Sequence, residues 1–170
     1  RATNQGSFAF NTFAVCAAGA VVGFDFKAGH ITIGTEADMA LLDNKAPHDP
    51  AGANWYTSFN AKWNAHVRGR LGLDVGPATS IYVAGGVAYL KMVTNDMDPE
   101  WSEVTETHTG WSAGGGLEHR IGRKLWLRAE YLHDDYRSRT GTIDYRGAPI
   151  YDFTTNPSTD SFRIGMVYRF

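Results

Sequence analysis

Apolar and polar residues alternate along much of the chain, most clearly in its last stretch, FRIGMVYRF (162–170). One side of this stretch is apolar or aromatic at every position: Phe162, Ile164, Met166, Tyr168 and Phe170. The other side carries two arginines, Arg163 and Arg169. Because successive side chains of an extended strand point to opposite faces, this period of two predicts a β-strand with one apolar and one charged face.

The same alternation recurs upstream and predicts seven strands, at residues 12–26, 30–43, 58–75, 79–93, 109–121, 124–138 and 160–170. Three connections are tight turns containing glycine or proline, at 27–29, 76–78 and 122–123. The other three are long and polar, at 44–57, 94–108 and 138–159. Short turns at one end and long loops at the other are typical of an up-and-down antiparallel transmembrane β-barrel. We therefore expect an all-β barrel that forms a single domain over residues 1–170.

Charged residues of both signs recur on one face of these strands: Glu36, Asp38, Arg68, Arg70, Glu118, Arg120, Arg128, Glu130 and Arg163. One interpretation is the solvated outer surface of a soluble barrel. Lysine, which such surfaces favour, is almost absent from these positions, whereas the planar guanidinium group of arginine suits enclosed carboxylates. We therefore interpret this face as the inside of a membrane barrel, where the charges form a network that plugs the lumen. His66 points the same way and is expected to join them.

The opposite face is apolar, with aromatic residues near the strand ends, as expected of a surface in contact with lipid. The residues assigned to this lipid-facing surface and its aromatic girdles are Trp63, Tyr89, Trp111, Leu125, Leu127, Tyr131, Phe162, Ile164, Tyr168 and Phe170. A slip of one residue would exchange the two faces. It would turn Arg128 toward lipid near the middle of the membrane, at a cost of about 2–4 kcal/mol.

The composition of the chain is compatible with a membrane barrel and argues against some other classes of protein. The 170 residues carry a net charge of −2, which argues against a nucleic-acid-binding protein. No apolar run approaches the roughly 20 residues of a transmembrane helix. The single cysteine, Cys16, cannot form an internal disulfide and leaves the redox compartment undecided. The chain begins at Arg1 without a signal peptide, which indicates a processed product or a missing beginning.

Candidate chemistry is sparse. A lipid-modifying barrel enzyme would need a nucleophile and a histidine on the same face, but Ser112 falls on the charged face and His119 on the apolar one. The acidic stretch NDMDPE (95–100) lacks the glycine and the ligand spacing of a calcium loop, which favours a solvated loop tip. No helix is expected after AGGG (113–116), so its glycines make room for bulky neighbours rather than forming a phosphate cradle. We expect no catalytic residue, metal site or cofactor.

The sequence resembles the alphaproteobacterial outer-membrane β-barrel family of small porin-like surface proteins, in VRGRLGLDVGP…IYVAGGVAYLKM (67–92), GWSAGGGLEHRIGRKLWLRAEYLHDDY (110–136) and FRIGMVYRF (162–170). The resemblance implies an eight-stranded barrel in the cell outer membrane, in contact with membrane lipid and lipopolysaccharide. It also implies insertion by the outer-membrane assembly machinery, which in such proteins reads the last strand and its final Phe170. The implied role is structural and at the cell surface. A lipid-modifying enzyme, a narrow porin-like channel and a soluble ligand-binding barrel are the alternatives.

Seven strands conflict with the even number typical of such barrels, in which the chain begins and ends on the periplasmic side. If Phe170 is periplasmic, six connections traced backwards place the start of the first predicted strand outside. We therefore expect one further strand before Arg1, with residues 1–11 as the tail of the first external loop. The family pattern agrees, because it begins with an aromatic and glycine-rich strand that is absent here.

Overall fold

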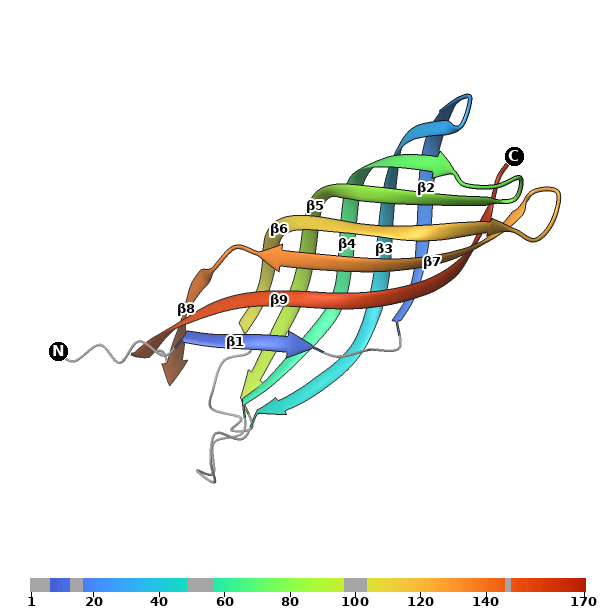
Figure 1. Ribbon diagram of the computed structural model, residues 1–170. Helices are drawn as coiled ribbons and strands as arrows, with labels where there is room; N and C mark the ends of the chain where they lie inside the picture. Colours follow the sequence, from blue (N-terminus) through green and yellow to red (C-terminus); the bar gives the residue numbers. More distant parts are fainter. Residues whose placement is uncertain (1–6, 13–16, 49–56, 97–103, 146–147) are drawn as a thin grey trace.

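A computed structural model describes the backbone of residues 7–12, 17–48, 57–96, 104–145 and 148–170, and side chains within 18–42, 61–93, 105–138 and 157–170. In the described part of the chain, one sheet contains the strands β1 Ser7–Thr12, β2 Ala17–Ala28, β3 Ile31–His48, β4 Thr57–Asp74, β5 Thr79–Asp96, β6 Val104–Arg120, β7 Leu125–Tyr136, β8 Arg139–Tyr145 and β9 Ala148–Tyr168 (Figure 1). These residues include no helix with the length and apolar character needed to cross a membrane.

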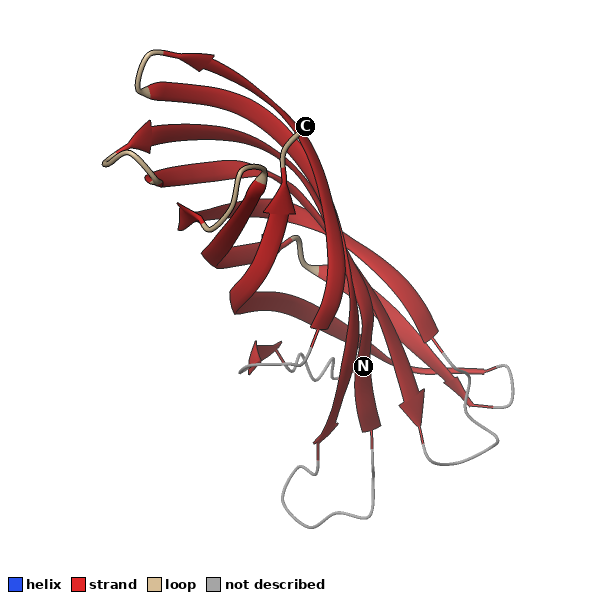
Figure 2. Ribbon diagram, turned by 90° about the vertical axis from the view of Figure 1, so that its right-hand side faces the viewer, coloured by secondary structure: helices blue, strands red, loops and turns tan. Residues whose placement is uncertain are grey.

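The seven long strands follow one another across the sheet in chain order, β2-β3-β4-β5-β6-β7-β9, and each is antiparallel to the next. The sheet curls into a half-barrel, seen from the side in Figure 2. The predicted all-β architecture and its seven antiparallel strands are confirmed. Opposite charges stand directly across from each other in three strand pairs: Glu36 and Arg68, Glu118 and Arg128, Glu130 and Arg163.

Three tight turns join strand pairs at one end of the sheet, as predicted. The turn after β2 contains Gly29 at φ 63°, a left-handed backbone conformation that glycine adopts without steric cost. In the turn after β4, the N–H groups of Val75 and Gly76 both donate to the carbonyl of Thr79. The turn after β6 repeats this arrangement, with Ile121 and Gly122 donating to Leu125.

Two segments differ from the arrangement expected from the sequence. The prediction of a loop at 138–159 is wrong, because β8 and the first part of β9 form a hairpin there, with Ile143 opposite Tyr151. β-Branched and aromatic residues continue in that polar stretch and favour extended backbone. Residues 7–11, expected within a loop tail, belong to the short strand β1, which pairs in parallel with β9 from Thr154 to Thr159.

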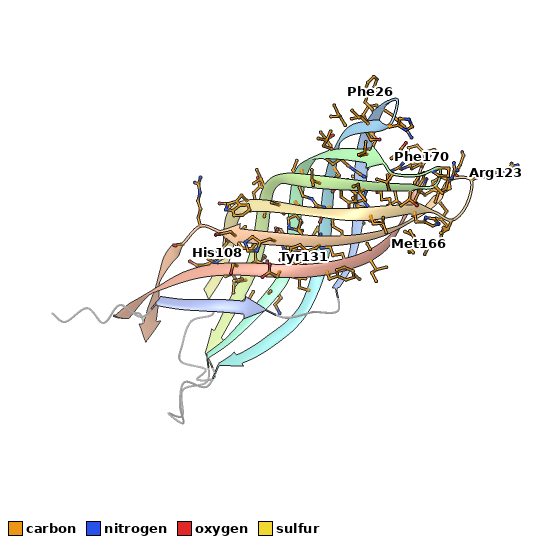
Figure 3. All side chains as sticks on the ribbon, viewed as in Figure 1. Phe26, His108, Arg123, Tyr131, Met166 and Phe170 are labelled. Atoms are coloured by element: carbon orange, nitrogen blue, oxygen red, sulfur yellow. The ribbon has the colours of Figure 1, made fainter. Side chains whose placement is uncertain are left out.

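The two faces of the sheet have opposite chemistry, and the charged face is the buried one. On the inner, concave face Arg68 is 2% exposed and Glu118 is fully buried. On the outer, convex face Ile164 is 71% exposed and Met166 is 69% exposed. Figure 3 shows the side chains of this part of the sheet as sticks, with Tyr131 and Met166 among those labelled. This is the reverse of a soluble β-sandwich, in which the apolar face is buried.

The curved sheet is open along one side. In the described part of the chain, β2 pairs only with β3, and β9 beyond Thr159 pairs only with β7. The inner side chains beside this opening are therefore less enclosed than those at the centre of the sheet. We call this opening the β2–β9 seam.

Candidate functional site

Charged side chains from six strands converge inside the curve of the sheet. We call them the arginine–carboxylate network: Asp25, Glu36, Asp38, Arg68, Arg70, Glu118, Arg128, Glu130, Arg163 and Arg169. The strands bring them together because residues two apart share a face and because the register sets acids opposite bases.

Arg68 occupies the centre of the network, and its side chain is 1% exposed. Its Nη2 lies 2.7 Å from Glu36 Oε1 and 3.0 Å from Asp38 Oδ2, both on β3. Its Nη1 lies 3.1 Å from Glu130 Oε1, on β7. Three carboxylates thus surround one guanidinium group, and they come from both sides of the curve.

Arg128 makes a second junction, closer to the end with the tight turns. Its Nε donates to Glu118 Oε1 over 2.9 Å, and its Nη2 lies 2.7 Å from the same oxygen. Its Nη1 donates over 2.9 Å to Glu36 Oε2. Arg70 reaches the other oxygen of Glu118 at 3.1 Å. Charge-assisted contacts of this kind are among the stronger hydrogen bonds in proteins, provided that each charge is paired.

Arg163 of β9 and Arg169, which directly follows β9, complete the network at the β2–β9 seam. Arg163 Nη1 donates to Asp38 Oδ1 over 2.8 Å, and Arg169 Nη2 donates to Glu118 Oε2. Asp25 of β2 lies 3.5 Å from Arg169. The side chains of Arg163 and Arg169 are 24% and 34% exposed, so the network is more open here than around Arg68.

Tyr82 of β5 packs beneath two of the guanidinium groups. Its ring centroid lies 4.3 Å from Cζ of Arg70 and 5.2 Å from Cζ of Arg128, within the range of cation–π contacts. Its hydroxyl donates to Glu130 over 2.9 Å. Directly opposite on β6, a Cβ at Gly116 would lie only 2.7 Å from the Tyr82 hydroxyl oxygen. This glycine therefore provides the space that the ring occupies, as expected of the AGGG stretch.

His66 links the network to a second group of polar side chains. Its Nδ1 lies 2.8 Å from Asp38 and its Nε2 lies 3.2 Å from Asp134. The hydroxyls of Tyr136 and Thr159 donate to the same oxygen of Asp134, over 3.4 Å and 3.3 Å. These five residues form what we call the His66 cluster. It is buried on the side of the network toward the long loops.

Beyond the His66 cluster a small apolar group lies beside buried polar side chains, with Asn64 and His108 directly opposite Leu90 on the neighbouring strands. Ala88, Leu90 and Tyr136 pack together there and are at most 3% exposed. Leu42 and Met92 pack against them. The inside of the sheet is therefore filled by charges at its centre and, toward the loops, by a small apolar group with buried polar neighbours. The alternation along the strands did not predict this group, because it indicates an inner face that is polar throughout.

Eight of the nine predicted inner charges meet in the network, and Arg120 does not. Arg120 is exposed at the end of β6, where its Nη2 donates to the carbonyl of Pro77 over 3.0 Å. Its place on the inner face is correct by alternation, but the strand ends there, so the side chain reaches the neighbouring turn instead. The predicted network left out Arg169, although the alternation places it on the charged side of the last strand, and Asp134, which continues the alternation of its own strand.

The apolar residues expected on the outer face are exposed or half-exposed. Trp63 and Leu125 are half-buried, and the others are exposed: Tyr89, Trp111, Leu127, Tyr131, Phe162, Ile164, Tyr168 and Phe170. The outer face also carries a polar group near the loops. There, Asp160 accepts hydrogen bonds of 2.6 Å from the Tyr131 hydroxyl and 2.8 Å from His133 Nδ1.

The candidate enzymatic residues do not converge. Ser112 is buried on the inner face, whereas His119 is exposed on the outer face with its Nδ1 3.0 Å from Thr79 Oγ1. Within the described residues there is no group of three or more acidic, histidine or cysteine side chains placed to hold a metal. Cys16 and most of the acidic stretch at 95–100 lie outside the described residues.

Comparison with known proteins identifies a family for this chain. The chain matches the family described as "Outer membrane protein beta-barrel domain" over residues 3–170. It is 28% identical, over 153 residues, to the "25 kDa outer-membrane immunogenic protein" of Brucella melitensis, covering 90% of this chain and 65% of the relative. It is 27% identical, over 122 residues, to the "22 kDa outer membrane protein" of Rhizobium leguminosarum, covering 72% and 53%.

The chain thus spans between about half and two thirds of the length of these relatives. Both the half-barrel with its exposed apolar face and the names of the relatives agree with the match over residues 3–170. This chain belongs to the outer membrane protein β-barrel domain family and is located in the outer membrane.

Proposed function

We propose that this protein is a structural and surface-presenting component of the outer membrane, and that its lumen is plugged, so that it conducts few or no ions. The observation that carries the proposal is the arginine–carboxylate network, in which Arg68 and Glu118 are at most 2% exposed. A barrel of about eight strands has an interior only wide enough for its own side chains. Guanidinium groups anchored on opposite walls would then block the path of a solute.

The outer face supports contact with lipid. From Phe162 to Phe170, the end of β9 and the two residues after it present an apolar side chain at every second position. These eight steps cover about 26 Å at roughly 3.3 Å per residue, or about 20 Å along the barrel axis at a tilt near 40°, close to the apolar band of about 25 Å in such barrels. The polar group around Asp160 would then stand at the outer boundary, among lipopolysaccharide head groups.

Assembly and surface exposure are part of the same proposal. Phe170 is fully exposed at the end of the chain, where the outer-membrane assembly machinery could bind it without unfolding the sheet. The long connections at the other end of the strands would face the medium. Relatives named immunogenic proteins are consistent with such loops at the cell surface.

We propose no enzymatic role, because the candidate nucleophile Ser112 and His119 lie on opposite faces.

Recordings in planar lipid bilayers test the plugged lumen. We expect the purified protein to show no steady conductance, while its heat-modifiable migration on gels demonstrates that it is folded. The matched variant R68S/E130S removes one ion pair from the centre of the plug and should admit a measurable current. A reproducible open channel in the unmodified protein would refute the plug and would favour the narrow porin-like alternative.

A further inference from the structure

The ring of His66 lies between two carboxylates that come from separate walls of the curved sheet. Its Nδ1 lies 2.8 Å from Asp38 Oδ1 on β3, and its Nε2 lies 3.2 Å from Asp134 Oδ2 on β7. The side chain of His66 is fully buried, so bulk water cannot replace either carboxylate as a partner. Each ring nitrogen therefore has a carboxylate oxygen as its hydrogen-bond partner.

Asp38 accepts a hydrogen bond from the ring. Arg68 Nη2 donates to its Oδ2 over 3.0 Å, and Arg163 Nη1 donates to its Oδ1 over 2.8 Å. Arginine stays protonated in proteins, so both contacts use lone pairs of the carboxylate. Oδ1 thus presents a lone pair to His66 as well, and Nδ1 has to carry the proton of that bond.

Asp134 is an acceptor in the same way. The hydroxyls of Tyr136 and Thr159 donate to its Oδ2, the oxygen that faces His66 Nε2. A neutral imidazole has one N–H group and one bare nitrogen, and the bare nitrogen would face a carboxylate on one side or the other. Hydrogen bonds to both carboxylates require protons on both nitrogens, which is the imidazolium form of His66.

The balance of charges inside the sheet agrees with this assignment. The arginine–carboxylate network holds five carboxylates and five guanidinium groups. Asp134 adds a sixth carboxylate, and among the described side chains the basic group paired with it is His66. A protonated His66 balances the interior. A neutral His66 leaves one buried negative charge without compensation, which is unfavourable in an enclosed site.

Other titratable groups nearby do not take this role. The charged and titratable side chains on the inner face around His66 are Asp38 of β3, Arg68 of β4, His108 of β6, Asp134 and Tyr136 of β7, and Arg163 of β9. The residue directly opposite on β5 is the uncharged Ala88. His108 is also buried, but its Nε2 lies 3.6 Å from Glu106, toward the loops. His66 is therefore the histidine whose charge links β3 to β7.

We propose that His66 holds a proton that is a structural part of the plug, and that release of this proton as the pH rises loosens the plug. After release, a bare ring nitrogen faces a carboxylate, and Asp38 and Asp134 lose the cation that joins their strands across the curve. Water or a cation from outside must then enter to compensate for the sixth carboxylate. The inference rests on the proposed plug and adds control by the pH of the medium.

Nuclear magnetic resonance tests the protonation state directly. The folded protein is labelled with nitrogen-15 histidine and placed in lipid nanodiscs, and the spectrum of His66→Gln identifies the signals of His66. At neutral pH we expect both ring nitrogens of His66 to carry a proton and to show the chemical shifts of imidazolium. A ring with only one protonated nitrogen would overturn the proposal.

A pH titration tests the loosening, scored as a current in planar bilayers or as loss of heat-modifiable migration. We expect loosening of the unmodified protein at the pH at which the His66 signals show loss of the second proton. Asp134→Asn removes the sixth carboxylate, so this variant should stay closed and folded at that pH. The control Glu106→Gln removes the carboxylate beside His108 and should respond like the unmodified protein.

The contrary outcomes are distinct from one another. A protein that stays closed and folded after His66 has lost its second proton would overturn the control by pH and leave the plug intact. Equal loosening of Asp134→Asn would show that the sixth carboxylate is not the cause. Loss of the response in Glu106→Gln alone would assign it to His108. A steady current already present at neutral pH would refute the plug itself, and the inference with it.

Discussion

The guanidinium group of Arg128 on β7 donates a hydrogen bond of 2.9 Å to the carboxylate of Glu36 on β3, 92 positions earlier in the chain. Three strands, β4, β5 and β6, lie between them in the sheet. The bond therefore crosses the inside of the curve instead of following the sheet. Backbone ladders hold each strand to its neighbours, whereas this contact braces two separated walls and stabilises the curvature.

Removal of Arg128 should be strongly destabilising. Arg128→Ala leaves Glu36 and Glu118 buried without one of their partners, and breaking a buried ion pair in this way typically costs about 3–5 kcal/mol. Urea unfolding in lipid vesicles, followed by gel migration, measures the loss. The control Arg120→Ala removes an exposed arginine from outside the network and should change the free energy of unfolding by no more than about 0.5 kcal/mol. Equal losses would contradict the bracing role.

An arginine substituted on the outer face should lower the free energy of unfolding, and the loss should increase with the depth of the residue in the membrane. Met166 lies at the middle of the apolar stretch of β9, and Phe162 at its edge. We expect Met166→Arg to cost about 2–4 kcal/mol and Phe162→Arg about 0–1 kcal/mol. The same vesicle unfolding assay compares them. If both substitutions were harmless, this face would be in water rather than in lipid.

His66 should stabilise the fold because its ring lies between two carboxylates. His66→Phe leaves Asp38 and Asp134 without their shared partner, and we expect a loss of about 1–3 kcal/mol or more. His119→Phe, on the exposed outer face, is the matched control and should have little effect. Adding Asp134→Asn to His66→Phe should recover part of the loss, because it removes one buried charge. Further destabilisation by Asp134→Asn would show that the two carboxylates act independently.

The fit between Gly116 and Tyr82 gives a prediction about packing. Gly116→Val would displace the Tyr82 ring, and overpacking of this kind costs about 1–3 kcal/mol. In a Tyr82→Ala background only part of that cost should disappear, because the added Cβ also lies 2.5 Å from the backbone oxygen of Ala129. A double-mutant cycle measures the part that is due to the Tyr82 ring. Gly69→Ala, where the nearest atom lies 4.0 Å from the added Cβ, is the control and should be tolerated. Additive effects of the Gly116 and Tyr82 changes would contradict the contact.

Much of the fold follows from the alternation of side chains. A period of two identifies both the strands and their faces, so residues such as Arg68 and Ile164 are assigned to opposite sides of the sheet without any knowledge of tertiary contacts. The tight turns follow from glycine and proline in the same way. Alternation does not show where a strand stops, which is why Arg120 was placed in the network although it is the last residue of β6 and its side chain reaches Pro77 instead.

Long-range features were less predictable. The partners of Arg128 come from β3 and β6, and only the curvature of the sheet brings Glu36 within reach. The hairpin of β8 and β9 was missed because polar composition favours a loop, although β-branched residues continue through it. The apolar group around Leu90 interrupts a face that is otherwise charged. The partners of Arg128 and the packing around Leu90 depend on neighbours distant in the sequence, whereas the hairpin is local.

The central claim is that the apolar face meets lipid and the charged face is enclosed. The most direct test is a nitroxide scan of residues 162–168 in lipid vesicles, with one cysteine introduced at a time in a C16S background. Oxygen concentrates in the hydrocarbon, so we predict high accessibility to oxygen at Phe162, Ile164, Met166 and Tyr168, and low accessibility at the residues between them. The opposite phase, or no alternation, would contradict the account.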